Sequence, residues 1–172
     1  MLSKKLQDAI NAQVNAEMWS AYLYLSMSLD ASNKGYKGAA NWFAVQFKEE
    51  QDHAQILINY MLSRGCEVKL AAISEVKTSW GSILEIFKDT LAHEKKVTAM
   101  FDNLANIAAD EKDFATSNML AWFIDEQIEE EKNALDIINA LEQVNDSKLG
   151  LYMVDKELAA RTYSTPAPLA AE

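Results

Sequence analysis

The chain contains few of the residues that break helices or cross-link small folds. Its 172 residues include one cysteine, two prolines and five glycines. A single cysteine excludes an internal disulfide framework and a cysteine-rich iron domain. Because both prolines, Pro166 and Pro168, lie near the end of the sequence, no earlier helix has to break at a proline. Long uninterrupted helices are therefore possible over most of the chain.

The chain also has little positive charge and no long apolar run. Its formal net charge of −10 repels nucleic acids and anionic membranes and attracts cations. The longest uncharged run, Met18 to Leu29, is too short to span a bilayer. Residues 1–8 are amphipathic with an early acid, unlike a secretory signal, and a lone cysteine suits a reducing compartment. We therefore expect a cytoplasmic protein with no nucleic-acid or membrane partner.

The apolar residues recur with the period of a helix, and no long alternating pattern indicates a sheet. The sequence predicts an all-α fold with four long helices. Each has roughly 30 residues and is about 45 Å long, whereas helices of globular proteins average about 11 to 12 residues. Gly65 is expected to end the second helix and Ser82 to cap the third. Such lengths are typical of a helical bundle. The four predicted helices span 3–32, 36–64, 82–109 and 112–144.

The connections predict the order of the helices in space. The segment 65–81 is long enough to travel the length of the bundle, which would make the second and third helices parallel neighbours, whereas the other two connections are short and predict antiparallel pairs. Residues 149–160 form a short apolar segment that is marginal as an isolated helix, so it should dock against this bundle or another subunit. We expect one domain over 1–160 and a loose, flexible tail over 161–172.

Each of the four predicted long helices carries an apolar stripe that is interrupted near its middle by a polar side chain able to bind a metal ion. Residues three, four or seven apart share one face of a helix, so these polar side chains should point where the core residues point. A carboxylate buried alone costs several kcal/mol, and several that converge require positive charge among them. We therefore predict a dinuclear metal site inside the bundle. The stripes are Ile10, Glu17, Tyr24; Phe43, Phe47, Glu50, Ala54, Leu57; Phe87, Leu91, Glu94, Val97, Phe101; and Leu120, Phe123, Gln127, Glu130, Ala134.

Several short segments, in this order and spacing, resemble the bacterial non-haem ferritins over about residues 1–160. The resemblance implies the ferritin-like four-helix bundle, with a long crossover between the second and third helices and a short fifth helix at the C-terminal end. Any one of these segments is a weak indication, but together they are specific. They are Asn15 to Glu17 with Tyr24, Phe47 to Ala54, His93-Glu94, Trp122 to Lys132 and Gly150 to Leu158.

The resemblance implies a ferroxidase centre that binds two iron ions. Glu17, Glu50 and His53 match the ligands of one iron, with Glu50 as the bridge. Glu94 and Glu130 match the ligands of the second iron. The ligand types agree, because oxygen donors with one imidazole suit iron or manganese, whereas a closed zinc site favours thiolates and several histidines.

Further residues match positions around this centre. A third iron site is implied that leads away from the first two, although a run of acids is also typical of a solvated helix face. Tyr24 is equally well explained as a core residue or as a redox partner beside the irons, and Trp122 as a packing residue. His93 is expected to be a surface or packing histidine. The third-site residues are Glu49, Glu126, Glu129 and Glu130, the nearby amide is Gln127, and the aromatic neighbours are Tyr24 and Trp122.

Two departures separate the chain from neighbouring families. Many di-iron enzymes carry a second Glu-x-x-His pair, but here Gln127 is followed three residues later by Glu130, so the second iron lacks a histidine ligand and should be held more weakly. Bacterioferritins use a methionine to bind haem. Here Asp52 stands just before His53, so no haem is expected.

The resemblance therefore implies an iron-storage protein with ferroxidase activity. It would oxidise Fe(II) to Fe(III) with dioxygen or hydrogen peroxide and deposit a ferric mineral inside a hollow homo-oligomeric shell of 24 subunits. Two other functions stay open from the residues themselves. One is a di-iron or di-manganese redox enzyme, such as a peroxidase, that keeps its metal. The other is a metal-free structural helical bundle.

Overall fold

The computed structural model describes residues 2–145 and 147–170, and every regular element among them is a helix. The first five helices confirm the predicted ones to within two residues at each end. The sixth is a short helix that the sequence pattern did not predict, and residues 171–172 of the predicted tail lie outside the described part. The helices are α1 Lys4–Asn33, α2 Lys37–Ser63, α3 Ile83–Asp110, α4 Phe114–Val144, α5 Lys148–Leu158 and α6 Ala167–Ala170.

Local chemistry fixes the helix ends where the sequence predicted them. The hydroxyl of Ser82 accepts a hydrogen bond from the backbone N–H of Glu85 at 3.1 Å, which is the N-cap geometry. Asp113 caps α4 in the same way, through the N–H of Thr116 at 2.9 Å. Gly65 follows α2 with a φ of +69°, a conformation that glycine adopts without steric cost.

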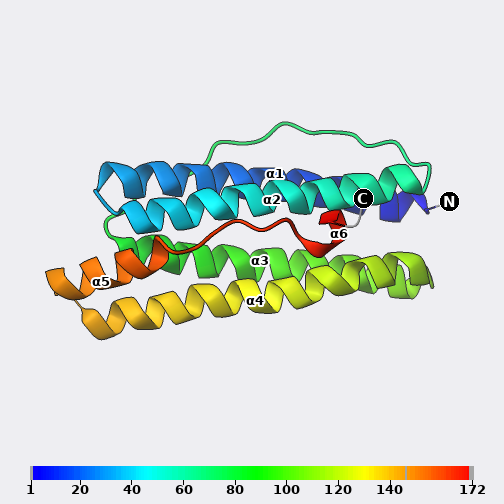
Figure 1. Cartoon of the computed structure of the whole chain (residues 1–172). Helices are drawn as coiled ribbons and strands as arrows, with labels where there is room; N and C mark the ends of the chain where they lie inside the picture. Colours follow the sequence, from blue (N-terminus) through cyan, green and yellow to red (C-terminus); the bar gives the residue numbers. More distant parts are fainter. Residues whose placement is uncertain (1, 146, 171–172) are drawn as a thin grey trace.

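The long helices form two antiparallel pairs, α1 with α2 and α3 with α4, that pack into one bundle (Figure 1). As predicted, the crossover 65–81 runs the length of the bundle, so that α3 runs parallel to α2. The prediction that α2 and α3 are neighbours is wrong, because α3 packs against α1 and lies diagonally across from α2. The crossover follows α1: Asn11 Oδ1 accepts from the N–H of Lys69 at 2.7 Å, and the hydroxyl of Ser26 donates to the carbonyl of Lys77 at 2.8 Å.

The core consists of two apolar clusters with a band of buried polar residues between them. One cluster contains residues such as Val14 and Phe123, and the other contains residues such as Tyr24 and Phe87. Along every long helix the residues of one cluster precede the polar band and those of the other follow it. The band is therefore held from both sides by close-packed apolar side chains.

Helix α5 docks on the chain's own bundle near the start of α2. The carboxylate of Asp155 accepts a hydrogen bond from the N–H of Ala39 at 2.9 Å and so caps α2, whose own N-cap residue supplies no side-chain bond. A Cβ atom on Gly38 would lie 1.6 Å from the carbonyl oxygen of Asp155, so α5 can approach this closely only because residue 38 is glycine.

None of the helices in the described ranges is long and apolar enough to cross a membrane.

Replacing Gly38 with Ala should therefore displace α5 from α2. We expect the free energy of unfolding to fall by about 1–3 kcal/mol, as for other overpacked contacts, which a thermal or denaturant melt would measure. Lys37→Ala, at an exposed neighbouring position, is the matched control and should change little. Equal stability of the two variants would show that α5 does not rest on this turn.

Candidate metal centre

Three of the predicted ligands meet in the buried band. Glu17 on α1 and Glu50 and His53 on α2 each offer a ligand atom, and these atoms all lie within 4.8 Å of one another. His53 Nδ1 is 3.7 Å from Glu17 Oε2 and 3.7 Å from Glu50 Oε2. The i, i+3 spacing places Glu50 and His53 on one face of α2, and that face is turned toward Glu17. All three side chains are buried.

The facing atoms of this triad have no hydrogen-bond partner within the described part of the chain. They are Oε2 of Glu17, Oε2 of Glu50 and Nδ1 of His53. Buried polar atoms in native proteins are nearly always satisfied, so atoms without a partner at one point indicate a ligand. Two carboxylates and one imidazole are a suitable donor set for iron, and the triad therefore fits the metal that the sequence predicts.

The electrostatics of the triad also favour a bound cation. Burial raises the pKa of Glu50 well above its usual value. Burial opposes the charged form of His53 as well, but the carboxylates of Glu17 and Glu50 outweigh it and raise the pKa of that imidazole. The same contact with His53 outweighs burial at Glu17 and lowers its pKa. Without metal, the positive charge in the triad therefore comes from a proton on His53, which both carboxylates stabilise. A metal ion can supply that positive charge instead.

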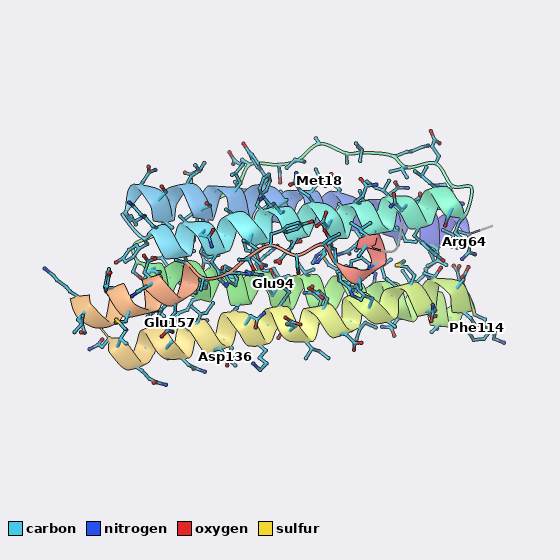
Figure 2. All side chains as sticks on the ribbon, in the orientation of Figure 1. Met18, Arg64, Glu94, Phe114, Asp136 and Glu157 are labelled. Carbon is cyan, nitrogen blue, oxygen red and sulfur yellow. The ribbon has the colours of Figure 1, made fainter. Side chains whose placement is uncertain are left out.

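Glu94, predicted to bind the second iron, lies near the middle of α3 (Figure 2). The Tyr24 hydroxyl donates a hydrogen bond to Glu94 Oε1, and Gln127 Nε2 donates to Glu94 Oε2 at 3.1 Å. Burial and the neighbouring charge of Glu130 raise the pKa of Glu94 well above its usual value. The charge of Glu130 therefore disfavours the charged form of Glu94. Neither belongs to the compact group formed by the triad.

Two buried glutamines complete the band, and the sequence analysis missed them. Gln13 Nε2 donates to Glu17 Oε1 at 2.6 Å, and Gln46 Nε2 donates to Glu130 Oε2 at 3.0 Å. Burial raises the pKa of Glu130 to about 7. Both glutamines stand four residues before a predicted ligand, Glu17 or Glu50, on the same apolar stripe. This repeated spacing could have identified them.

The acids predicted for the third site gather around one cavity. Glu49, Glu126 and Glu129 line a space of about 260 Å³, together with His53 and Glu130 of the inner group. Glu49 and Glu126 are half-buried and Glu129 is exposed. The cavity therefore connects the buried band with a more open acidic face of α2 and α4. The sequence analysis also missed Arg161, which lines the same cavity and pairs with Glu49.

The aromatic and histidine neighbours pack as the sequence suggested. The Trp122 ring meets the His53 ring edge to face, with centroids 5.5 Å apart. His93 Nε2 lies 2.8 Å from the Ser20 hydroxyl, and burial lowers the pKa of His93 to about 4. His93 is therefore a neutral packing residue, in agreement with the prediction.

Comparisons with known proteins point to one family. The family model of the ferritin-like domain matches residues 7–144. The bacterial non-heme ferritin of Staphylococcus aureus (strain USA300) is 44% identical over 163 residues, which cover 95% of this chain and 98% of that protein. The bacterial non-heme ferritin of Bacteroides fragilis (strain 638R) is 42% identical over 161 residues, which cover 94% of this chain and 100% of that protein. These matches confirm the resemblance that the sequence motifs predicted.

Solved structures confirm the fold. A novel open-pore ferritin from the hyperthermophilic archaeon Archaeoglobus fulgidus matches with a TM-score of 0.93 and 43% identity, over 94% of this chain and 100% of that one. An engineered closed form of the Archaeoglobus fulgidus ferritin matches with a TM-score of 0.94 and 42% identity, over 95% of this chain and 100% of that one. The subunit fold is thus shared with both the open and the closed form.

Replacing Glu50 with Ala tests the metal centre without any reaction. In metal-free protein the thermal midpoint should stay level or rise, because a buried acid that repels its neighbours is removed. Co(II), which binds the native state, should raise the midpoint of the wild type but raise that of the variant much less. Glu75→Ala, an exposed acid in the crossover, is the control and should respond like the wild type. If Co(II) raised the thermal midpoint of Glu50→Ala as much as that of Glu75→Ala, the metal would have to bind elsewhere.

Proposed function

The chain belongs to the ferritin-like family, and from that premise we propose that it stores iron. It oxidises Fe(II) to Fe(III) with dioxygen or hydrogen peroxide and deposits a ferric mineral inside a hollow oligomeric shell. Iron is here the substrate and the cargo. The observation that carries the proposal is the buried group of two carboxylates and one imidazole, whose facing atoms have no hydrogen-bond partner among the described residues.

We assign the first iron to Glu17, Glu50 and His53, with Glu50 as the bridge, and the second iron to Glu94 and Glu130. The distances within the triad support the first assignment. The second assignment is supported by the burial of both acids and by the charge of Glu130, which raises the pKa of Glu94, because buried acids whose charges repel favour a cation near them. Carboxylates suit this task because they bind both oxidation states of iron and can change from terminal to bridging coordination.

Two further residues position the second set. The hydrogen bonds from Tyr24 and Gln127 hold the two oxygens of Glu94 from opposite helices, α1 and α4. In the proposed reaction each Fe(II) gives up one electron. Two electrons and two protons together reduce one dioxygen to hydrogen peroxide, or one hydrogen peroxide to two water molecules. Tyr24 is a positioning residue in this proposal, because its hydroxyl contacts Glu94, a proposed ligand of the second iron.

Iron retention separates the proposed function from its alternatives. With excess Fe(II) in air, a storage protein should retain far more iron than the two or three ions per chain that its sites can bind. A di-iron or di-manganese redox enzyme would stop at that small number, and a structural bundle would retain none. Elemental analysis of the isolated native particle gives the ratio. The Glu50→Ala variant is the control, and its initial oxidation rate should be strongly reduced.

We further propose that residues 1–160 form the iron-handling domain of a cytoplasmic protein that assembles into a shell of 24 copies. The support for assembly comes from α5, which docks Val154 and Leu158 on the bundle but leaves a second apolar face open. On that face Leu149, Tyr152 and Met153 are 71%, 63% and 49% exposed. Exposed apolar patches of this kind are typical of contacts between subunits. The single cysteine suits a reducing compartment.

Changing Leu149, Tyr152 and Met153 together to Ser should leave the subunit folded but weaken the shell, because contacts between copies would lose apolar area. Light scattering would report a smaller or less stable particle, while circular dichroism should stay the same. Serine at the polar positions Lys148, Lys156 and Glu157 of the same helix is the control. A particle of normal size and stability after the apolar changes would show that α5 is not a subunit contact.

A further inference from the structure

The segment that follows α5 continues along α2 and ends in α6 (Figure 1). Arg161, near the start of this segment, reaches the acids predicted for the third metal site. Arg161 Nη2 lies 2.5 Å from Glu49 Oε2, and each of the two side chains is only 19% exposed. The guanidinium carbon lies 4.3 Å from the centroid of the Trp42 ring. A cation of the chain itself therefore lies where the third metal ion is expected.

Several contacts that do not involve the guanidinium hold this segment in place. The Asn41 side chain donates to the carbonyl oxygen of Arg161 at 2.9 Å, and the Tyr163 hydroxyl donates to Asp52 at 2.7 Å. Farther along, Leu169 packs against the apolar cluster that contains Val14. The position of the segment therefore does not depend on the ion pair, and the guanidinium can change its contacts while the backbone stays docked.

The segment also covers the cavity that connects the two acidic sets. Residues 164–167 line it from one side, and His53 and Glu130 of the inner group line it together with Glu49, Glu126 and Glu129 of the outer group. A volume of about 260 Å³ is large enough for several water molecules or for a hydrated ion. An ion that passes between the two sets would therefore pass Arg161.

The guanidinium balances these acids but is not fully satisfied by them. Burial raises the pKa of Glu49, and the charge of Arg161 is the largest effect that opposes this shift. Its charge acts on Glu126 and Glu130 in the same direction. Nη1 of Arg161, however, is buried and has no hydrogen-bond partner among the residues that the structure describes. A permanent structural pair would normally satisfy such an atom, so its unsatisfied state favours a contact that is exchanged.

We infer that Arg161 is a built-in counter-ion of the outer acidic set, which holds Glu49 while the set is empty and competes with an incoming hard divalent or trivalent cation for that carboxylate. Cation binding displaces the guanidinium from Glu49, and loss of the cation lets it return. Arg161 is thus a positioning residue that weakens the third site and so promotes the release of metal from it. The inference depends on the proposed function only in assuming that cations enter this set.

Calorimetric titration with Zn(II), which undergoes no oxidation in air, tests the competition. Arg161→Gln should strengthen the weakest class of Zn(II) sites tenfold or more, because both a competitor and a repelling charge are lost. Arg161→Lys should keep most of the competition. Lys156→Gln, which removes an exposed positive charge from α5, should leave the affinity unchanged. Unchanged affinity in Arg161→Gln would overturn the inference and make the contact a simple ion pair.

Two further measurements separate the effect of the guanidinium charge from the effect of the segment's lining of the cavity. Tyr163→Phe removes the hydrogen bond to Asp52 but no positive charge, so it should raise the Zn(II) affinity only slightly. A rise equal to that of Arg161→Gln would overturn the inference that Arg161 competes with the cation for Glu49. In a Glu49→Gln background, Arg161→Gln should raise the Zn(II) affinity much less than it does in the wild-type background, because the carboxylate for which the guanidinium and the cation compete is absent. An equal rise in both backgrounds would count against displacement. Because no step requires oxidation, these results are independent of whether the particle stores iron.

Discussion

The structure is governed by the need to balance several carboxylates that are buried at one level of a helical bundle. Glu17, Glu50, Glu94 and Glu130 are all nearly inaccessible to solvent, and burial opposes the charged form of each of them. A core with this composition is unfavourable unless protons, hydrogen-bond donors or cations compensate it. The donors Gln13 and Gln46 and the imidazole of His53 satisfy part of this requirement. The buried atoms that have no partner in the described part of the chain mark the place proposed for the metal.

The same requirement explains why the helices are so long. A polar band in the core contributes little apolar burial, so the free energy that holds four helices together has to come from either side of it. The two apolar clusters supply this burial, one around Val14 and Phe123 and the other around Tyr24 and Phe87. Because each helix continues for several turns beyond the band, the ligands are positioned by rigid elements and not by loops, which is what a precise metal site requires.

Sequence reasoning succeeded where the cause was local and failed where it was tertiary. Helix ends were predictable because caps such as Ser82 and turns such as Gly65 act within a few residues. The pairing of α3 with α1 was not predictable, because the periodicity of the sequence shows which face of a helix is buried but not which helix packs against that face. Arg161 was missed because it contacts Glu49, which stands 112 residues away in the chain, and because its segment has no apolar period. How the predicted ligands bind metal remains a proposal.

The two acidic sets compensate their charge differently, and the difference follows from solvent access. Inside the band, a permanent guanidinium would occupy the volume proposed for the metal, and burying it would cost several kcal/mol. At the outer set, Glu49 is only half-buried, and the long side chain of Arg161 rests on the Trp42 ring, which lowers the cost of holding a charge there. An internal cation at the outer set weakens metal binding along the way out of the centre. The inner acids therefore favour capture of a cation, whereas the outer acids, already balanced, favour its release.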